Sequence, residues 1–234
     1  RETLLPVKGI PLELGVDAGV QRPACIIGQT MPNGQDRLLG EVMPGRVGVQ
    51  RFADAIKREI AELAALAEID HLEIGSVYGD PWGFVGADQE AGELAWMERL
   101  ALELGCPILP TETNEIEPRL DAVRDDLTYM IDGETPALLI SPRCKITRKG
   151  FASHYRYRKE RVGNTERTAD KPEKNEEANL QDALQYKKLG KKGRWGVVGQ
   201  KRGVRERPGE DPRLREAARD PKKGVVIRDG GMKW

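Results

Sequence analysis

The 234-residue sequence has few of the residues on which nucleophilic and soft-metal chemistry depend, with only two histidines and three cysteines. The two histidines, His71 and His154, argue against a Ser-His-Asp triad and against a metal site built from several imidazoles. The cysteines, Cys25, Cys106 and Cys144, are odd in number and lack metal-type spacing, which argues against a disulfide framework and a zinc knuckle. Metal chemistry in this chain must therefore rest mainly on carboxylates.

Several sequence signals of other protein classes are also missing. No apolar run reaches 18 residues, so no transmembrane helix is expected, and the first residues do not form a signal peptide. Neither G-x-G-x-x-G nor G-x-x-x-x-G-K-[ST] occurs, which argues against a dinucleotide-binding turn and a P-loop. With 38% hydrophobic and 32% charged residues, the chain is expected to be soluble and to form a real core, and its length fits one full domain or one domain plus a loosely folded appendage.

The formal net charge of zero hides two regions of opposite sign. Residues 187–234 carry 16 of the 38 basic and six of the 38 acidic side chains, which leaves 22 basic and 32 acidic residues before them. We therefore predict a folded domain over residues 1–188 and a basic, partly extended tail over 189–234. Val197–Val198 and Val225–Ile227 are its only strand-like clusters. The tail is either a solvated appendage or an arm that binds a polyanion.

Hydrophobic periodicity and turn residues predict the order of secondary structure. Strands are expected at Leu12–Asp17, Ala24–Thr30, Arg37–Val42, Leu72–Tyr78, Pro107–Leu109 and Ala137–Ile140. Helices are expected at Phe52–Ala67, Leu94–Leu104, Pro118–Ile131 and Glu176–Lys187, with a basic hairpin or loop insert at 143–174. Three antiparallel strands followed by alternating strands and helices imply an α/β fold, a mixed sheet with helices on both faces. This is the order of ribonuclease H-like folds.

Three aspartates are expected to meet at one edge of this sheet. Asp17 ends the first strand, Asp80 follows the fourth, and Asp182 lies on the last helix. If the first and fourth strands are neighbours and the helix crosses their ends, the carboxylates would repel one another unless divalent cations bind them. Hard oxygen ligands select Mg²⁺ or Mn²⁺, and two such ions can promote phosphodiester cleavage. Taken singly, Asp17 and Asp80 also suit turns and Asp182 a solvated helix face, and Glu41 is a weaker candidate at the same edge.

Basic residues between the last strand and the last helix form a candidate DNA-binding surface. The residues concerned are Arg143, Lys145, Arg148, Lys149, Arg156, Arg158 and Lys159. The alternation Tyr155-Arg156-Tyr157-Arg158 suits a hairpin with one basic face. Such side chains can neutralise phosphates without reading sequence, so little sequence specificity is expected. The alternative is an exposed charged hairpin that only favours solubility.

A set of motifs between about Leu14 and Tyr186 carries a family resemblance. They are Gly15-Val16-Asp17-Ala18-Gly19 with Ile27-Gly28-Gln29, Pro32-Asn33-Gly34 before Leu38-Leu39-Gly40-Glu41, Tyr78-Gly79-Asp80-Pro81 with Gly83, Asn114 with Arg119-Leu120-Asp121-Ala122-Val123-Arg124, Ile131-Asp132-Gly133, and Lys174-Asn175 before Asp182-Ala183-Leu184-Gln185-Tyr186. In this order the motifs resemble the C-terminal nuclease domain of the large terminase subunit of tailed bacteriophages. One departure is Ala178-Asn179, where many relatives have Ser-His.

The resemblance implies an endonuclease that cuts concatemeric double-stranded DNA with two Mg²⁺ or Mn²⁺ ions held by Asp17, Asp80 and Asp182. It also implies an ATPase domain in the same full-length protein, portal and small-subunit partners, no membrane partner, and a place in the host-cell cytoplasm. Other hypotheses stay open at this point. They are an actin-like ATPase or sugar-kinase fold, a Holliday-junction resolvase, and a non-catalytic module that docks a portal or partner protein.

Overall fold

The computed structural model describes residues 4–19, 22–87, 92–162, 165–173, 175 and 177–202. At 154, 158–162, 165–171 and 193–202 it describes the backbone alone. Residues 1–198 form one compact unit, and a second unit, residues 199–234, contributes only the last four residues of a helix to the described part. Among the described residues, no helix combines the length and hydrophobicity that a membrane crossing requires.

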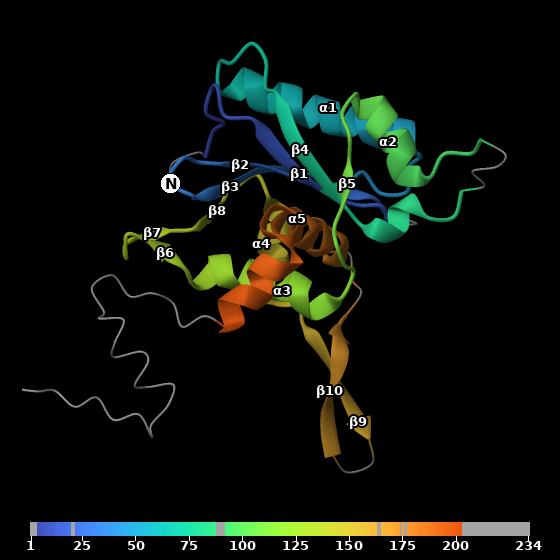
Figure 1. The fold of residues 1–234 in the computed structure, drawn as a ribbon, viewed down its shortest axis with the longest axis vertical. Helices are drawn as coiled ribbons and strands as arrows, with labels where there is room; N and C mark the ends of the chain where they lie inside the picture. Colours follow the sequence, from blue (N-terminus) through green and yellow to red (C-terminus); the bar gives the residue numbers. More distant parts are fainter. Residues whose placement is uncertain are drawn as a thin grey trace, which may run out of the picture. The chain divides into compact units, whose positions relative to one another are not determined.

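A six-stranded mixed sheet forms the centre of the first unit, in the order β5-β4-β1-β2-β3-β8 (Figure 1). Its strands are β1 Leu12–Asp17, β2 Ala24–Thr30, β3 Asp36–Val42, β4 Ile74–Gly79, β5 Leu109–Pro110 and β8 Leu138–Ile140. The first three pair antiparallel, as the Asn33-Gly34 turn predicts, whereas β4 pairs with β1 in parallel. The first and fourth strands are therefore neighbours, which confirms the predicted order.

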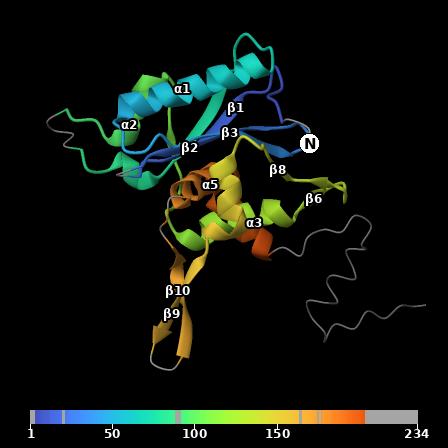
Figure 2. The same cartoon turned by 180° about the vertical axis from the view of Figure 1, so that it is seen from behind.

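The remaining elements cover the sheet or project from it (Figure 1, Figure 2). The α-helices are α1 Val49–Leu66, α2 Trp96–Leu104, α3 Ile116–Thr128, α4 Lys145–Lys149 and α5 Ala178–Arg202. Short segments are the 3₁₀-helix Pro81–Phe84, the π-helix Gly150–His154 and the strand pair β6 Met130–Ile131 with β7 Thr135–Pro136. Strands β9 Tyr157–Val162 and β10 Thr165–Pro172 form a hairpin that points away from the sheet.

Alternate side chains of β1 face two different layers. Leu12, Leu14 and Val16 are fully buried in the core shared with α1 and α2. Glu13, Gly15 and Asp17 therefore face the opposite layer, where α5 lies. The core on that side joins residues of β2, β3 and β8 to an apolar stripe on α5, and its central members are Ala24, Ile26, Leu38, Leu180, Ala183 and Leu184.

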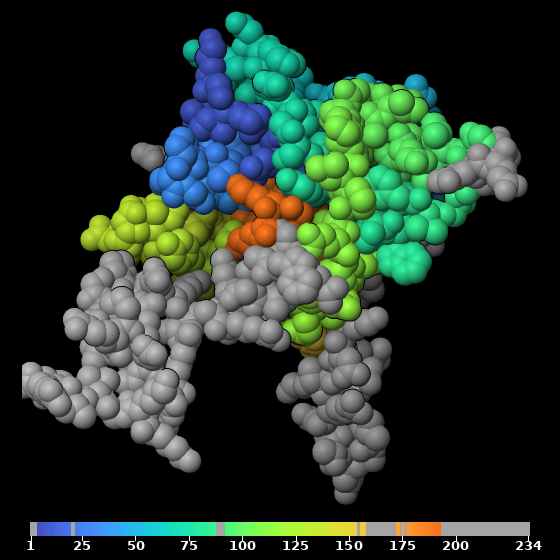
Figure 3. All heavy atoms as spheres, viewed as in Figure 1, coloured from blue at the N-terminus to red at the C-terminus, as the bar shows by residue number. Residues whose placement is uncertain are grey.

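Helix α5 approaches the sheet so closely that only glycine fits at the contact points. A Cβ atom at Gly15 of β1 would overlap the carbonyl oxygen of Ala183, and one at Gly190 would overlap the ring of Tyr78 on β4. In the space-filling view the described side chains of α5, in orange, lie against the blue and teal strands and the green α3 (Figure 3). This close packing fixes the position of every α5 side chain that faces β1.

Farther along α5, a group of charges replaces the apolar stripe, and three of its members, Asp36, Lys187 and Lys188, are buried. We call it the lysine cluster, and its members are Glu13, Asp36, Asp126, Lys187, Lys188, Lys191 and Lys192. The Nζ atom of Lys187 is fully buried, 2.8 Å from Asp36 Oδ1 and 3.1 Å from Glu13 Oε2. Lys188 forms ion pairs with both Asp36 and Asp126, and its Nζ atom lies 2.6 Å from Asp126 Oδ2. Lys191 and Lys192, which the prediction placed in the basic tail, are thus ion-pair partners of the acidic body, as are Lys187 and Lys188 at the end of the predicted domain.

The structure differs from the predicted elements mainly toward the C-terminus. Helix α5 continues to Arg202 instead of ending at Lys187, and Val197–Val198 belong to it rather than to a strand. Glycines lower helix propensity, but the ion pairs of residues 187–192 hold this part of the helix on the body. Helix α3 ends at Thr128, and Ile131 lies in β6. The tail prediction for 203–234 lies outside the described residues.

Candidate active site

All three predicted aspartates line one cavity of about 620 Å³ between the sheet edge, α3 and α5. The cavity is lined by Asp17, Asp80, Asn114, Glu115, Ile116, Glu117, Pro118, Arg119, Tyr155, Pro172, Glu173, Ala178, Asp182 and Tyr186. Six carboxylates and one guanidinium thus belong to the lining, a strong excess of negative charge. Phosphate groups would be repelled from such a cavity unless cations entered with them.

Asp17 and Asp80 reach the cavity from the ends of neighbouring parallel strands. The backbone N–H of Asp80 donates to the carbonyl of Val16 at 3.3 Å, which holds the two strand ends together. The Asp80 carboxylate accepts a 3.0 Å hydrogen bond from the N–H of Trp82 and so caps the following 3₁₀-helix. Asp17 is only 6% exposed, and its Oδ1 accepts the N–H of Gly19 at 3.4 Å. Both acids therefore shape local turns as well as line the cavity.

Asp182 enters from α5 and is paired with an arginine that sequence reasoning gave no role. The guanidinium of Arg119, on α3, donates to Asp182 Oδ1 through Nη2. Arg119 also donates to Gln185 Oε1 at 3.1 Å and to Asn114 Oδ1 at 2.7 Å. Its carbon Cζ lies 4.4 Å from the centre of the Tyr186 ring, a cation–π contact. Only the resemblance pointed to Asn114 and Arg119, because their partners on α5 are remote in sequence.

Two tyrosines complete the wall. The hydroxyl of Tyr186 donates to Asn114 Oδ1 at 2.7 Å, and the amide of Gln185 donates to the hydroxyl of Tyr155 at 2.9 Å. Burial raises the pKa of Tyr155 to about 12, and the negative charge of Asp182 adds to the rise. Burial and the charges of the three aspartates likewise raise the pKa of Tyr186, against the effect of Arg119. Both hydroxyls therefore stay protonated at neutral pH, and that of Tyr186 is a hydrogen-bond donor.

The electrostatics of Asp80 reflect the crowding of charge. Burial raises its pKa above the usual value, and the charge of Asp182 adds to the rise. The hydrogen bond from Trp82, the charge of Arg119 and a hydrogen bond with Tyr186 act in the opposite direction but do not cancel it. A carboxylate that is disfavoured in this way gains more from a cation than an exposed one does.

The cavity offers the oxygen ligands that Mg²⁺ and Mn²⁺ prefer, yet the ligand set is not closed. Over the described part of the chain, no three His, Cys, Asp or Glu side chains stand close enough together to hold a metal ion. Asp17, Asp80 and Asp182 share the cavity, while Asp182 is bonded to Arg119. The residues fit a divalent cation by their chemistry, and binding one would require the three side chains to move closer together.

The predicted DNA-binding residues fall into three groups. Arg143 pairs with Glu59 and Glu62 at 3.1 and 3.2 Å, and Lys149 pairs with Glu177 at 2.6 Å. Lys145 and Arg148 on α4 and Arg156 before β9 are exposed. The side chains of Arg158 and Lys159 lie outside the described residues. The hairpin begins and ends at the cavity, because Tyr155 and Pro172 belong to its lining.

Glu41, the weaker acidic candidate, has a structural role. Its carboxylate accepts the backbone N–H groups of Ile146 and Thr147 at 2.7 and 2.8 Å, and also the Thr147 hydroxyl. It thus satisfies the first N–H groups of α4, which have no partner within the helix. Glu41 is not among the residues that line the cavity.

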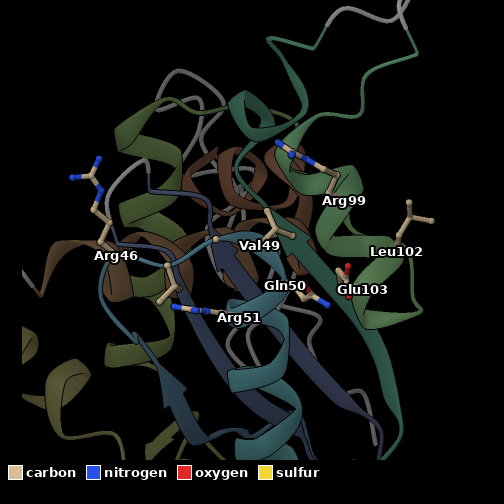
Figure 4. A pocket seen from close by; sticks show the side chains of 9 residues that line it. Arg46, Val49, Gln50, Arg51, Arg99, Leu102 and Glu103 are labelled. Atoms are coloured by element: carbon tan, nitrogen blue, oxygen red, sulfur yellow. The ribbon is translucent and has the colours of Figure 1, made fainter.

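A second hollow, of about 750 Å³, lies between the start of α1 and α2 (Figure 4). Arg46, Arg51 and Arg99 line it together with Glu103. It belongs to the layer of α1 and α2, whereas the aspartates and α5 belong to the other layer. Its three arginines are exposed.

No protein-family model and no curated protein sequence matches this chain. Among solved structures, the large terminase from a thermophilic bacteriophage matches with a TM-score of 0.50 and 14% identity, over 80% of this chain and 41% of that chain. Thermus thermophilus RuvC in complex with a Holliday junction substrate matches with a TM-score of 0.36 and 11% identity, over 80% of this chain and 96% of that chain.

A ROK family glucokinase from Streptomyces griseus matches with a TM-score of 0.27 and 16% identity, over 48% of this chain and 35% of that chain. The chain spans about two fifths of the length of the solved terminase. The terminase match and the sheet order agree with the element order read from the sequence. The chain has a ribonuclease H-like α/β fold, with helices on both faces of a mixed sheet.

Proposed function

We propose that this chain is a metal-dependent DNA endonuclease domain with little sequence specificity. The observation that carries the proposal is the convergence of Asp17, Asp80 and Asp182 on one cavity, from two adjacent strand ends and a crossing helix. The base of a projecting hairpin, at Tyr155 and Pro172, forms another part of the same wall. The similarity in fold to a phage large terminase supports the same proposal.

Charge explains why the reaction needs cations. A phosphodiester that approaches six carboxylates and one guanidinium meets net repulsion, which divalent cations would remove. When bound, a pair of Mg²⁺ or Mn²⁺ ions supplies an activated water and stabilisation of the leaving oxygen. Asp17 and Asp80 would hold such ions from the strand ends, and Asp182 would complete the site from α5.

The exposed basic residues of α4 and of the start of the hairpin would bind the DNA backbone. Lys145, Arg148 and Arg156 are placed on α4 and at the start of the hairpin, and contacts from them to phosphates carry no base information. Arg143 and Lys149 are partners of acidic side chains, so we assign them to holding α4 in place. Their contribution to DNA affinity would be smaller than that of the exposed three.

The test is cleavage of supercoiled plasmid in Mn²⁺ by the wild-type chain and by its Asp182→Asn variant, with EDTA as a control. We expect nicked and linear products from the wild type, none with EDTA, and a loss of about a thousandfold or more in the variant, since metal catalysis is worth several kcal/mol. The matched control is Asp54→Asn, an exposed residue of α1, which should cleave as the wild type does. Activity that persists in Asp182→Asn would place the reaction elsewhere.

We further propose that the domain is the nuclease part of a DNA-packaging terminase, with an ATPase domain, a portal and a small subunit as partners. The motif order between Leu14 and Tyr186 supports this finer proposal, as does the match to only 41% of the solved terminase. Sequencing of the genomic region upstream of the codon for Arg1 tests it. A Walker motif in the same reading frame is expected, and a start codon directly before Arg1 would contradict the proposal.

A further inference from the structure

Arg119 is a deeply buried cation in the wall of the acidic cavity. Its side chain is only 7% exposed, and its guanidinium contacts four side chains. Three of these contacts, with Asp182, Gln185 and the Tyr186 ring, lie at i, i+3 and i+4 on one face of α5, and the fourth is with Asn114. Arg119 therefore connects α3 to the segment of α5 that carries the third aspartate.

The charge of Arg119 offsets part of the negative charge of the cavity lining. Asp182 is 5% exposed and shares the cavity with Asp17 and Asp80, and a buried carboxylate without a partner is strongly disfavoured. Arg119 is the one basic residue in the described lining of the cavity. The guanidinium thus neutralises part of a charge that a divalent cation would also neutralise.

The Arg119 guanidinium and a metal ion would compete for the carboxylate of Asp182. The Oδ1 atom of Asp182 accepts from Arg119, and the described residues hold no closed group of three metal ligands. For Asp182 to join Asp17 and Asp80 around an ion, its carboxylate must shift part of its bonding from the guanidinium to the ion. The like charge of Arg119 also repels an entering cation.

We propose that Arg119 is a positioning residue that serves as the resident counter-ion of the site. It holds Asp182 in the cavity while no metal is bound, and it lowers the affinity for divalent cations by competing for the same carboxylate. The inference rests on the proposed function. It predicts that loss of the guanidinium lowers the stability of the metal-free protein and raises its affinity for divalent cations. An arginine with a purely structural role would not produce both effects.

The experiment is a Mn²⁺ titration by calorimetry, combined with melting curves in EDTA, on the wild type and three substitutions. For Arg119→Gln we expect a melting temperature about 10 °C lower in EDTA, because a buried partner is lost. We expect its Kd for Mn²⁺ to be about tenfold lower than that of the wild type. For Arg119→Lys, which keeps the charge, the melting temperature and the Kd for Mn²⁺ should lie between those of the wild type and of Arg119→Gln. Arg124→Gln, an exposed arginine of the same helix, should match the wild type.

The outcomes separate this inference from the proposed function. Mn²⁺ affinity in Arg119→Gln that equals or falls below the wild-type value, while Asp17→Asn abolishes binding, overturns the counter-ion role and leaves the metal site intact. Absence of Mn²⁺ binding in every protein overturns both proposals. If Arg119→Gln does not fold, the double variant with Asp182→Asn decides, because removal of both charges should restore folding. A double variant that is no more stable than Arg119→Gln contradicts the inference.

Discussion

Helix α5 contributes to two groups of charges, and they differ in balance. In the lysine cluster, four ammonium groups of α5 meet three carboxylates from β1, β3 and α3. In the cavity, a single guanidinium meets six carboxylates. The two groups lie within a few turns of one another on the same helix. Nearly balanced charges can form a stable structural contact between α5 and the rest of the fold, whereas a group with excess negative charge is neutralised only when cations bind.

The pKa values of the two aspartates Asp36 and Asp80 show the same contrast. Burial alone would raise the pKa of Asp36, but Lys187 and Lys188 hold it well below its usual range. Burial would lower the pKa of Lys187, but Asp36 and Glu13 raise it. In the cavity, burial dominates, and the pKa of Asp80 is raised. The fold therefore favours the ionised form of Asp36 and disfavours the ionised form of Asp80.

The largest change in stability expected from this comparison follows from disrupting the lysine cluster. Asp36→Asn removes the carboxylate that both buried lysines share, so we expect a loss of about 3 kcal/mol in the free energy of unfolding, measured with urea at pH 7. The matched control, Asp54→Asn on the exposed face of α1, should change it by less than about 0.5 kcal/mol. An effect of Asp36→Asn as small as that of the control would show that the lysine cluster does not hold α5.

A smaller change in stability, opposite in sign to that of Asp36→Asn, is expected for a substitution in the cavity, measured in EDTA. A carboxyl group whose pKa is raised by folding makes the folded protein lose stability as the pH rises above the unfolded value near 4. Asp80→Asn removes this loss while asparagine can still cap the 3₁₀-helix. The melting temperature of Asp80→Asn, relative to the wild type, should therefore rise between pH 4 and pH 7. A relative melting temperature that falls over this range would contradict the assignment.

The pH dependence of the lysine cluster has the reverse sign. Asp36, with its lowered pKa, contributes stability that is present above the unfolded pKa and is lost as the pH falls through that value toward the lower folded one. The destabilisation caused by Asp36→Asn should accordingly shrink as the pH is lowered from 7 to 3. Melting curves over the same pH range test both variants. If the melting temperatures of Asp36→Asn and Asp80→Asn, each relative to the wild type, change with pH in the same direction, the proposed difference between the two groups of charges is refuted.

Sequence patterns predict the sheet and the placement of Asp17 and Asp80 at strand ends. The alternation in Leu12–Asp17 is local, and it already places Asp17 at a strand end on the face away from the apolar core. Strand ends also locate Asp80, since Gly79 and Pro81 mark the end of β4. These predictions depend only on neighbours in sequence and on the order of elements.

Residues whose roles depend on remote partners could not be predicted in this way. Arg119 and Asp182 are 63 positions apart, and nothing in either local segment indicates the pair. Lys187 and Glu13 are 174 positions apart, so charge counting grouped the lysine with the basic residues of 187–234 and not with its acidic partners. The length of α5 was underestimated for a related reason, because tertiary ion pairs override the low helix propensity of its glycines.

The most direct test of the central claim is to locate divalent cations in crystals of this chain soaked in Mn²⁺, by anomalous scattering. The account predicts anomalous peaks in the cavity, within about 2.2 Å of carboxylate oxygens of Asp17 and Asp80, and none at the lysine cluster. Arg119 should have moved off Asp182, or share it, wherever Asp182 joins the ligands. Soaked crystals with no peak between Asp17 and Asp80 would contradict the claim that this cavity is a metal site.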